Sequence, residues 1–213
     1  MKEFSFEVMQ RDDTKVYLCS YKIFDPFLYL DYLSESEKER MFTFKHVKRR
    51  REFIATRILR HSIFGFKHIH YNQHGAPYIE DAGFISISHC KNLVGIALNE
   101  HYKIGLDLES PRENIGVLSH KFLSDHELKS FEINNSLELT KIWSAKEALY
   151  KLAGRKQIIF KEELLLTKLD NDNWQGQIVN EDHDLFVNLD IFEFNKVIVS
   201  LNKGPIVKKP RNI

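Results

Sequence analysis

The sequence predicts an α+β fold made of two similar halves, in each of which a small sheet packs with helices. The order of elements carries this prediction: a strand, two helices and further strands fill the first half of the 213-residue chain, and helices followed by strands fill the second. A polar connection over residues 111–116 separates the two series. We therefore predict an N-terminal half over residues 1–110 and a C-terminal half over residues 111–213, related by element order and not by a repeated sequence.

The composition narrows the class of protein. With 43% hydrophobic residues, the chain can bury a substantial core. Its net charge of +1 gives no electrostatic argument for a nucleic-acid or membrane partner. The cysteines, Cys19 and Cys90, imply no disulfide framework. Since the sequence shows neither a signal-peptide pattern nor an apolar run of membrane-spanning length, we expect a cytoplasmic protein.

The first half contains a strand signal and two helix signals. Residues 15–23 alternate as a strand does, and a capping-box pattern over residues 34–37 predicts a helix that begins near Ser34. A second helix is predicted over residues 45–64. Its apolar stripe consists of Val47, Ile54, Ile58 and Leu59.

This second helix is strongly basic. One acid, Glu52, stands among the cations Lys45, Lys48, Arg49, Arg50, Arg51, Arg57 and Arg60. Such a run is typical of a solvated helix face. It is also compatible with an anion site, because the arginine fork suits phosphate and Arg51 lies away from the apolar stripe. The residues leave both interpretations open.

The second half begins with helices and ends with strands. A capping box over residues 124–127 predicts a helix that ends near residues 134–135. A longer helix is predicted over residues 136–153, with Gly154 as its C-terminal cap. The remaining strand signals lie at residues 164–169, 174–179, 185–194 and 196–201.

Residues 84–110 are the centre of the chain and predict three short strands. In the last of them, Asp107 and Glu109 point to the same side, beyond Gly105, which leaves room. Carboxylates this close raise each other's pKa unless a cation lies between them. The pair therefore indicates a metal ion or a shared proton.

The long helix and the first of these strands add further polar groups. Glu147 and Lys151 are four residues apart and hence neighbours on one face, which is typical of a stabilising pair on a solvent face. If Glu147 instead converges on the two strand carboxylates, the three form an all-oxygen site that suits Mg²⁺, and Lys151 can hold a phosphate. Ser88 and His89 either end their strand or donate to a phosphate.

Together these motifs resemble a known family, the 4′-phosphopantetheinyl transferases. The chain is similar to the larger, monomeric surfactin-synthetase-activating type, and the resemblance covers roughly residues 30–160. Two of the motifs, Gly-x-Asp-x-Glu and Trp-x-x-Lys-Glu-Ala, are fairly specific as an ordered pair. The motifs lie at residues 85–89, 104–109, 122–127 and 143–151.

The resemblance implies a fold of two similar halves with coenzyme A in the cleft between them. Asp107, Glu109 and Glu147 would hold Mg²⁺ on the pyrophosphate. A carrier-protein serine would attack the β-phosphorus of coenzyme A, and 3′,5′-ADP would leave. Lys151 and His89 would contact the phosphates and complete the catalytic set with Glu147. The base would be Glu147 or a metal-bound water that it orients.

The resemblance also implies coenzyme A contacts in the first half. Arg51, with Ser88 and Arg40, would bind the adenosine 3′-phosphate end. Gly75 and Pro77 match a turn of the family that contributes to the same site.

Two departures from the family leave an alternative function open. The family commonly has a lysine between the glycine and proline of that turn, whereas this chain has Ala76. Many members also follow the long helix with a Gly-x-Gly-Leu turn, which residues 154–158 of this chain lack. The alternative is a catalytically silent relative that binds coenzyme A or a carrier protein. Glu127 matches a family glutamate and can equally close the capping box with Ser124. The expected partners are coenzyme A and an acyl or peptidyl carrier protein, with no nucleic acid or membrane, and we expect a monomer.

Overall fold

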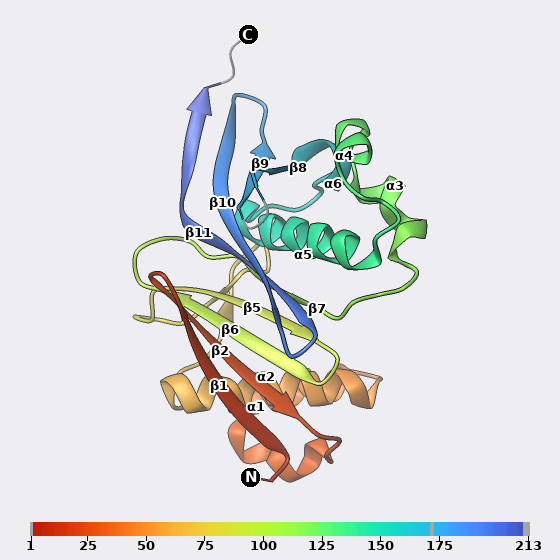
Figure 1. Cartoon of the computed structure of the whole chain (residues 1–213). Helices are drawn as coiled ribbons and strands as arrows, with labels where there is room; N and C mark the ends of the chain where they lie inside the picture. The colour runs from red at the N-terminus through yellow and green to blue at the C-terminus, as the bar shows by residue number, and fades with distance from the viewer. Residues whose placement is uncertain (1, 171–172, 211–213) are drawn as a thin grey trace.

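The computed structural model describes residues 2–170 and 173–210 and confirms an α+β class, with sheets packed against helices (Figure 1). A four-stranded sheet and a five-stranded sheet lie between the long helices α2 and α5. Across the described ranges, no helix is long and apolar enough to cross a membrane.

The N-terminal sheet is antiparallel and has the strand order β1-β2-β6-β5. Its strands are β1 (Phe4–Arg11), β2 (Thr14–Tyr21), β5 (Phe84–Cys90) and β6 (Leu93–Asn99). The sequence predicts all of these except β1, which is an edge strand with mostly exposed residues and so carries no clear buried alternation. A separate ribbon is formed by β3 (His70–Tyr71) and β4 (Pro77–Tyr78).

The two predicted helices of the first half, α1 (Glu35–Thr43) and α2 (Val47–Phe64), begin close to the predicted positions. The 3-10 helix η1 (Pro26–Tyr32) before them was not predicted. At the start of α1, the Ser34 hydroxyl accepts from the Glu37 amide while the Glu37 carboxylate accepts from the Ser34 amide. The predicted capping box is therefore confirmed.

The predicted apolar stripe of α2 is only partly right. Ile54, Ile58 and Leu59 are buried against the N-terminal sheet, but Val47 is 46% exposed. Val47 is the first residue of the helix, and the buried segment of α2 begins only at Glu52. Helical periodicity gives the direction of a side chain and not whether the neighbouring layer extends that far.

The C-terminal sheet is also antiparallel and has the strand order β7-β11-β10-β9-β8. Its first strand along the chain precedes residue 110, yet it pairs with the last strand of this sheet. The central stretch therefore contributes to both sheets. The strands are β7 (Leu106–Glu109), β8 (Leu164–Lys168), β9 (Trp174–Val179), β10 (His183–Phe194) and β11 (Val197–Pro210).

One long helix covers the C-terminal sheet, and short helices surround it. They are the 3-10 helix η2 (Ile115–Leu118), α3 (Ser119–Phe122), α4 (Asp125–Ser130), α5 (Ser136–Ala153) and α6 (Phe160–Glu163). The long helix α5 has the predicted bounds and ends at Gly154, which has φ 63°. The helix from the second capping box ends at Ser130, earlier than predicted, because the following residues form a separate loop before Asn135 caps α5.

The two sheets share a core. Apolar side chains of β2 and β6 pack against those of β7 and β11, so that β7 is buried on both faces. At its start, a Cβ on Gly105 would overlap the carbonyl oxygen of Ala148 in α5. Gly105 therefore permits the close approach of β7 and α5 that brings their polar residues together.

Candidate active site

Two serine side chains of β5 form hydrogen bonds with β7 and hold Asp107 in position. The Ser88 hydroxyl donates to Asp107 Oδ1 at 3.0 Å and accepts from the Leu108 amide at 3.1 Å. The Ser86 hydroxyl accepts from the Leu106 amide at 2.9 Å. The alternating serines thus bridge the two sheets, and the Ser88 hydroxyl is occupied within the protein.

Lys151 reaches the same carboxylate from α5. Its Nζ lies 3.0 Å from Asp107 Oδ1 and 2.6 Å from the carbonyl oxygen of Leu106. The lysine thus pairs with a strand carboxylate instead of forming a solvent-face pair along its own helix. The other oxygen of Asp107, Oδ2, is buried and has no hydrogen-bond partner.

The two glutamates of the predicted metal site have different surroundings. Burial, and after it the negative charge of Asp107, raise the pKa of Glu147 to about 7. Burial also raises the pKa of Glu109, against the effect of Arg112. Arg112 donates to both oxygens of Glu109, at 3.1 and 2.9 Å, and the indole of Trp143 donates to it at 3.2 Å.

The donor set suits Mg²⁺, although the side chains are not yet grouped around a common point. Within residues 2–170 and 173–210, no three His, Cys, Asp or Glu side chains are arranged to hold a metal ion as they stand. Asp107 Oδ2 is buried without a hydrogen-bond partner, and the pKa values of Glu109 and Glu147 are raised mainly by burial, so a cation would find an unpaired oxygen and two carboxylates whose charge it could stabilise. All three residues offer the hard oxygen ligands that Mg²⁺ prefers.

Lys151 lines a cavity of about 670 Å³, whereas Asp107, Glu109 and Glu147 are not among its wall residues. Its wall combines the β3–β4 ribbon and β5 with the C-terminal end of α5. Of the predicted coenzyme A contacts, this wall includes Gly75, Pro77, His89 and Lys151.

His89 lies at the edge of the cavity between an arginine and a buried acid. Its Nε2 is 2.6 Å from Arg49 Nη1, and its Nδ1 is 3.9 Å from Glu52 Oε2. A guanidinium can only donate, so Nε2 accepts and the imidazole is neutral here. Burial lowers the pKa of His89, Glu52 opposes this effect, and Arg49 and Lys151 add to it. Arg49 also lines the cavity, although the sequence analysis singled out Arg51.

The two arginines that were predicted to contact coenzyme A, Arg40 and Arg51, lie outside the cavity wall. Arg51 donates through Nε to the carbonyl oxygen of Phe24 at 2.7 Å. The Arg40 guanidinium stacks 4.7 Å from the ring centroid of Tyr71, which is itself a wall residue. Neighbouring arginines of one helix turn point in different directions, and no sequence signal distinguishes Arg49 from Arg51.

A buried ion pair that the sequence analysis missed supports α5. Lys146 is fully buried and donates to Glu127 Oε2 at 2.7 Å and to the carbonyl oxygen of Phe122 at 2.5 Å. Glu127 also accepts from the amides of Ser124 and Leu166, both at 2.8 Å. The second capping box is thus confirmed, and its glutamate anchors the helix that carries Glu147. A capping-box acid followed by a lysine within an apolar helix is the signal that could have indicated this pair.

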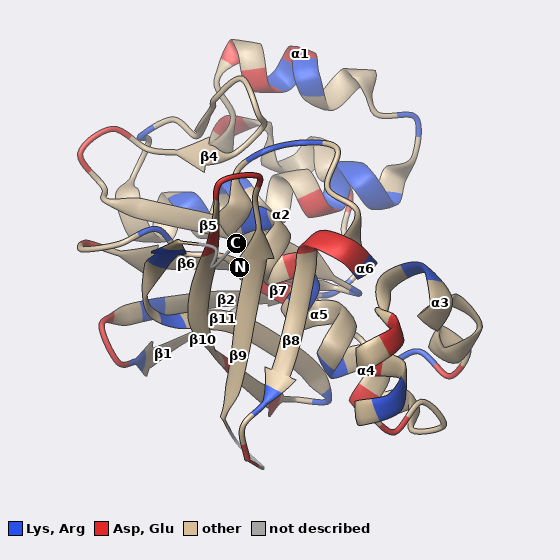
Figure 2. Cartoon of the chain, turned by 90° about the horizontal axis from the view of Figure 1, so that it is seen from above, with Lys and Arg blue, Asp and Glu red and all other residues tan. Residues whose placement is uncertain are grey.

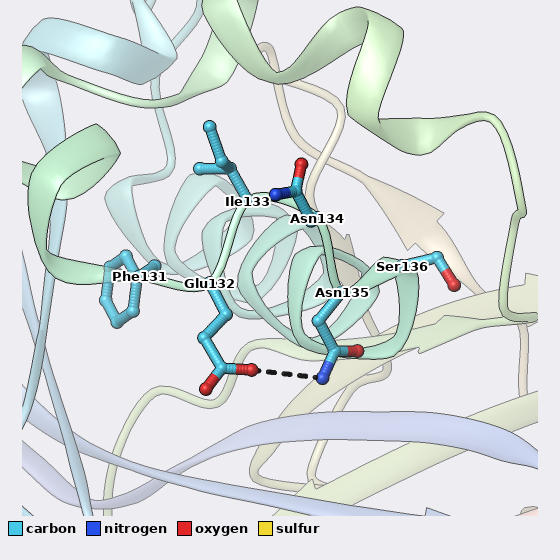
Figure 3. A pocket seen from close by; sticks show the side chains of 6 residues that line it. All are labelled: Phe131, Glu132, Ile133, Asn134, Asn135 and Ser136. Carbon is cyan, nitrogen blue, oxygen red and sulfur yellow. Dashed lines mark hydrogen bonds between the residues drawn. The ribbon is translucent and has the colours of Figure 1, made fainter.

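A second cavity, of about 740 Å³, contains none of the candidate residues. It lies along the loop between α4 and α5 (Figure 3). Glu132 and Asn135 hydrogen-bond to each other there at 3.4 Å, and Asn135 caps the first turn of α5. Its polar groups therefore have structural roles.

Comparison with known proteins bears on the C-terminal part of the site. Residues 103–200 match the family model of the 4′-phosphopantetheinyl transferase superfamily. No curated protein matches the chain significantly. The matched span contains β7 and α5, and with them Asp107, Glu109, Glu147 and Lys151.

Proposed function

We propose that this protein transfers the 4′-phosphopantetheine group of coenzyme A to a serine of an acyl or peptidyl carrier protein, because residues 103–200 match the family model of the 4′-phosphopantetheinyl transferase superfamily. The reaction depends on Mg²⁺ and releases 3′,5′-ADP. The observation that carries the proposal is that Lys151, which pairs with Asp107, lines a cavity large enough for a nucleotide-sized ligand.

Coenzyme A is proposed to bind in the 670 Å³ cavity, between the two halves of the chain. The wall draws on β5 and the β3–β4 ribbon from one half and on the end of α5 from the other, which favours a cleft between them. Lys151 and His89 would contact the phosphates, together with Arg49. These groups would fix the pyrophosphate by charge-assisted hydrogen bonds.

Asp107, Glu109 and Glu147 would hold the metal ion. When bound, Mg²⁺ would offset the negative charge of the pyrophosphate. Asp107 and Glu109 are buried and Glu147 is partly buried, which strengthens their attraction for a cation. Ser88, through its bond to Asp107 Oδ1, would keep that carboxylate oriented.

The transfer itself is a displacement at phosphorus. The serine oxygen forms a bond to the β-phosphorus, and the bond from that phosphorus to the bridging oxygen breaks, so that 3′,5′-ADP leaves with the oxygen. Glu147 would take the serine proton. A carboxylate held in a buried, acidic environment is a better base than one in water.

Intact-mass measurement of an apo carrier protein tests this proposal. The carrier is incubated with the protein, coenzyme A and Mg²⁺, with a matched incubation in EDTA. A gain of one phosphopantetheine that EDTA prevents is the expected result. Mass gain that persists in EDTA contradicts the metal dependence, and no gain on any of several carriers contradicts the transfer.

A second candidate function is a catalytically silent relative that binds coenzyme A or a carrier protein. The contact of Arg112 with both oxygens of Glu109 favours it, because that arginine stands where a cation would be needed. Coenzyme A binding that Mg²⁺ does not strengthen, together with no mass gain, would select this alternative.

A further inference from the structure

The carboxylate of Asp107 is bonded through one oxygen only. Its Oδ1 accepts from the Ser88 hydroxyl and from Lys151 Nζ, both at 3.0 Å. Its Oδ2 is buried and has no hydrogen-bond partner among the described residues. A buried polar atom without a partner is rare in folded proteins and calls for an explanation. Because both donors bind the same oxygen, the orientation of this carboxylate is fixed from one side only.

A buried hydroxyl without a partner lies on the neighbouring strand. In the register of β7 and β11, Ser200 is paired directly with Asp107. Residues directly opposite in an antiparallel pair project from the same face, with their Cβ atoms about 4.5–5.5 Å apart. Ser200 is 0% exposed, and its Oγ has no hydrogen-bond partner within residues 2–170 and 173–210. An unused donor and an unused acceptor therefore occupy adjacent strands on one face of the sheet.

The face that Ser200 and Asp107 share is the one that α5 covers. Val199 and Leu201, on either side of Ser200, belong to the core between the two sheets. Since side chains alternate along a strand, Ser200 points to the opposite face. On that face α5 packs against both β7 and β11 (Figure 2), and Lys151 of α5 reaches Asp107 there. Ser200 therefore lies in the same interface as the proposed metal ligands.

The other polar side chain on this face of β11 already binds the β7 segment. Asn202 accepts from the Gly105 amide at 2.9 Å and donates to the carbonyl oxygen of Lys103 at 3.0 Å. Ile198, two residues before Ser200, is apolar and fully buried. A buried hydroxyl without a partner is less favourable than an apolar group of similar size, so packing alone does not account for a serine here.

A cation at Asp107 would create the need for a new donor. The Lys151 ammonium and a metal ion are both positive, so they compete for the same carboxylate and repel each other. A change of rotamer at Ser200 moves its Oγ without moving the backbone, and the separation of paired residues leaves a hydrogen bond to Asp107 within reach. Protein donors to the outer side of a carboxylate are what orients it for a metal ion.

We propose that Ser200 is a positioning residue for Asp107: its hydroxyl turns to donate to Oδ2 when a cation binds and so fixes the plane of the carboxylate. This inference rests on the metal site of the proposed function and adds to it a residue on the last strand of the sheet. The hydroxyl touches neither the ion nor the substrate, and it acts only through Asp107.

Within the described ranges, one other serine hydroxyl is buried without a partner. Ser144 of α5 is fully buried, and its Oγ is also unpaired. It lies one turn before Ala148, whose carbonyl oxygen meets Gly105 at the start of β7. Four helical residues span about 6 Å and two strand residues about 6.7 Å, so Ser144 is level with Asp107. Ser144 is therefore the alternative donor that the experiment has to distinguish.

Binding of Mn²⁺ to the full chain without coenzyme A tests the positioning separately from the chemistry. Mn²⁺ takes the same kind of oxygen ligands as Mg²⁺, and the electron paramagnetic resonance signal of the free ion gives the Kd. The variants are Ser200→Ala, Ser200→Thr, which keeps a hydroxyl, and Ser144→Ala. The control is Thr140→Val, because Thr140 is also fully buried but its hydroxyl donates to the carbonyl oxygen of Ser136 within α5.

Ser200→Ala should raise the Kd for Mn²⁺ about ten-fold. Its melting temperature without the ion should stay within about 2 °C of the wild type, because Oγ has no hydrogen bond to lose. Ser200→Thr should bind Mn²⁺ within about three-fold of the wild type, and Thr140→Val within about two-fold. A lower melting temperature with an unchanged Kd for Ser200→Ala would indicate a merely structural role and overturn the proposal. So would weaker binding by Ser144→Ala while Ser200→Ala binds normally.

Mass gain on a carrier protein, measured with the same variants, separates this proposal from the transferase. Weaker Mn²⁺ binding by Ser200→Ala in a protein that modifies no carrier would uphold the positioning role and refute the transfer. Transfer by the wild type, with a Kd that Ser200→Ala leaves unchanged, would refute the positioning role alone. If the wild type binds no Mn²⁺, the positioning role fails together with the proposed metal site, whether or not transfer occurs.

Discussion

The helix pairs α1–α2 and α4–α5 are stabilised by the same kind of ion pair, but they contribute side chains of opposite charge to the candidate site. In each pair, the glutamate of a capping box forms an ion pair with a buried cation of the following helix: Glu37 with Arg57 at 2.9 Å, and Glu127 with Lys146 at 2.7 Å. Both long helices have 18 residues and end at a glycine with φ 63°. The α2 side contributes Arg49, which we call the cationic wall. The α5 side contributes Glu147, with Asp107 and Glu109 of β7, and we call these three carboxylates the anionic wall.

The two ion pairs differ in how the charge is shared. Arg60 also faces Glu37, at 3.6 Å, and donates to the carbonyl oxygens of Tyr32 and Lys67. The N-terminal acid therefore has two cations, each with a delocalised charge. Lys146 concentrates its charge on one ammonium, and burial lowers its pKa while Glu127 opposes that change. The same kind of buried ion pair therefore supports both long helices, the one behind the cationic wall and the one behind the anionic wall. The anionic wall depends on the single pair of Glu127 and Lys146.

The largest expected effect on stability comes from removing the ion pair between Glu127 and Lys146. Glu127→Gln should lower the free energy of unfolding by about 3–5 kcal/mol, because it leaves the Lys146 ammonium buried without a counter-charge. Urea denaturation at pH 7 measures the change. Glu37→Gln is the matched variant and should cost about half as much, since Arg60 retains its bonds to backbone carbonyls.

A double variant sharpens this test. Glu127→Gln with Lys146→Met should recover a large part of the lost stability, because no buried charge remains. Equal losses for Glu127→Gln and Glu37→Gln would contradict the difference that we infer between the two pairs.

The next effect concerns the anionic wall itself. Glu147→Gln keeps the shape of the side chain and removes its charge, so the folded protein should lose about 100- to 1,000-fold in transfer rate, or about 3–4 kcal/mol of transition-state stabilisation. Initial rates of mass gain on a carrier protein measure it. Glu138→Gln, on the same helix but paired with the surface residue Lys168, is the control and should stay within about two-fold. Full activity of Glu147→Gln would remove this residue from the proposed chemistry.

Local signals predicted the elements around the site because the determinants are close in sequence. Alternation predicts the first and last of the three strands over residues 84–110, a short apolar run predicts the middle one, and a terminal glycine predicts the end of α5. The placement of Asp107 and Glu109 side by side on β7 required only the period of a strand.

Long-range partners could not be predicted in the same way. Arg57 and Arg60 were interpreted as part of a solvated face or an anion site, but both are buried against Glu37, 20 residues before Arg57. Ser88 was considered as a phosphate donor or a strand end, yet its hydroxyl holds Asp107, 19 residues away. These contacts depend on how layers stack, which the local periodicity of a helix or strand does not contain.

The pH dependence of stability should also differ between the two walls. The pKa of Glu147 is raised from 4.5 to about 7 in the folded protein, so folding favours its protonated form. The contribution of this group to the free energy of unfolding is at most about 3 kcal/mol. It is complete below pH 4.5 and is lost as the pH rises through about 7. Thermal or urea unfolding of the metal-free protein between pH 4.5 and 8 measures the slope.

Two comparisons identify the group responsible for that slope. Glu147→Gln should flatten it, whereas Glu138→Gln should leave it unchanged. Added Mg²⁺ should reduce it in the wild type if the ionised carboxylates bind the ion. A slope that Glu147→Gln retains in full would assign the titration to another group.

The smallest expected effect concerns Arg112, which places a cation on the anionic wall. It holds Glu109 through two hydrogen bonds, but its side chain is 55% exposed, so the pair contributes only about 0–1 kcal/mol. Arg112→Ala should therefore release Glu109 and tighten Mg²⁺ binding by up to about five-fold, measured by calorimetric titration of Mg²⁺ in the presence of coenzyme A. Lys129→Ala is the control for loss of a surface charge. Weaker binding by Arg112→Ala would mean that the arginine orients Glu109 for the metal and does not compete with it.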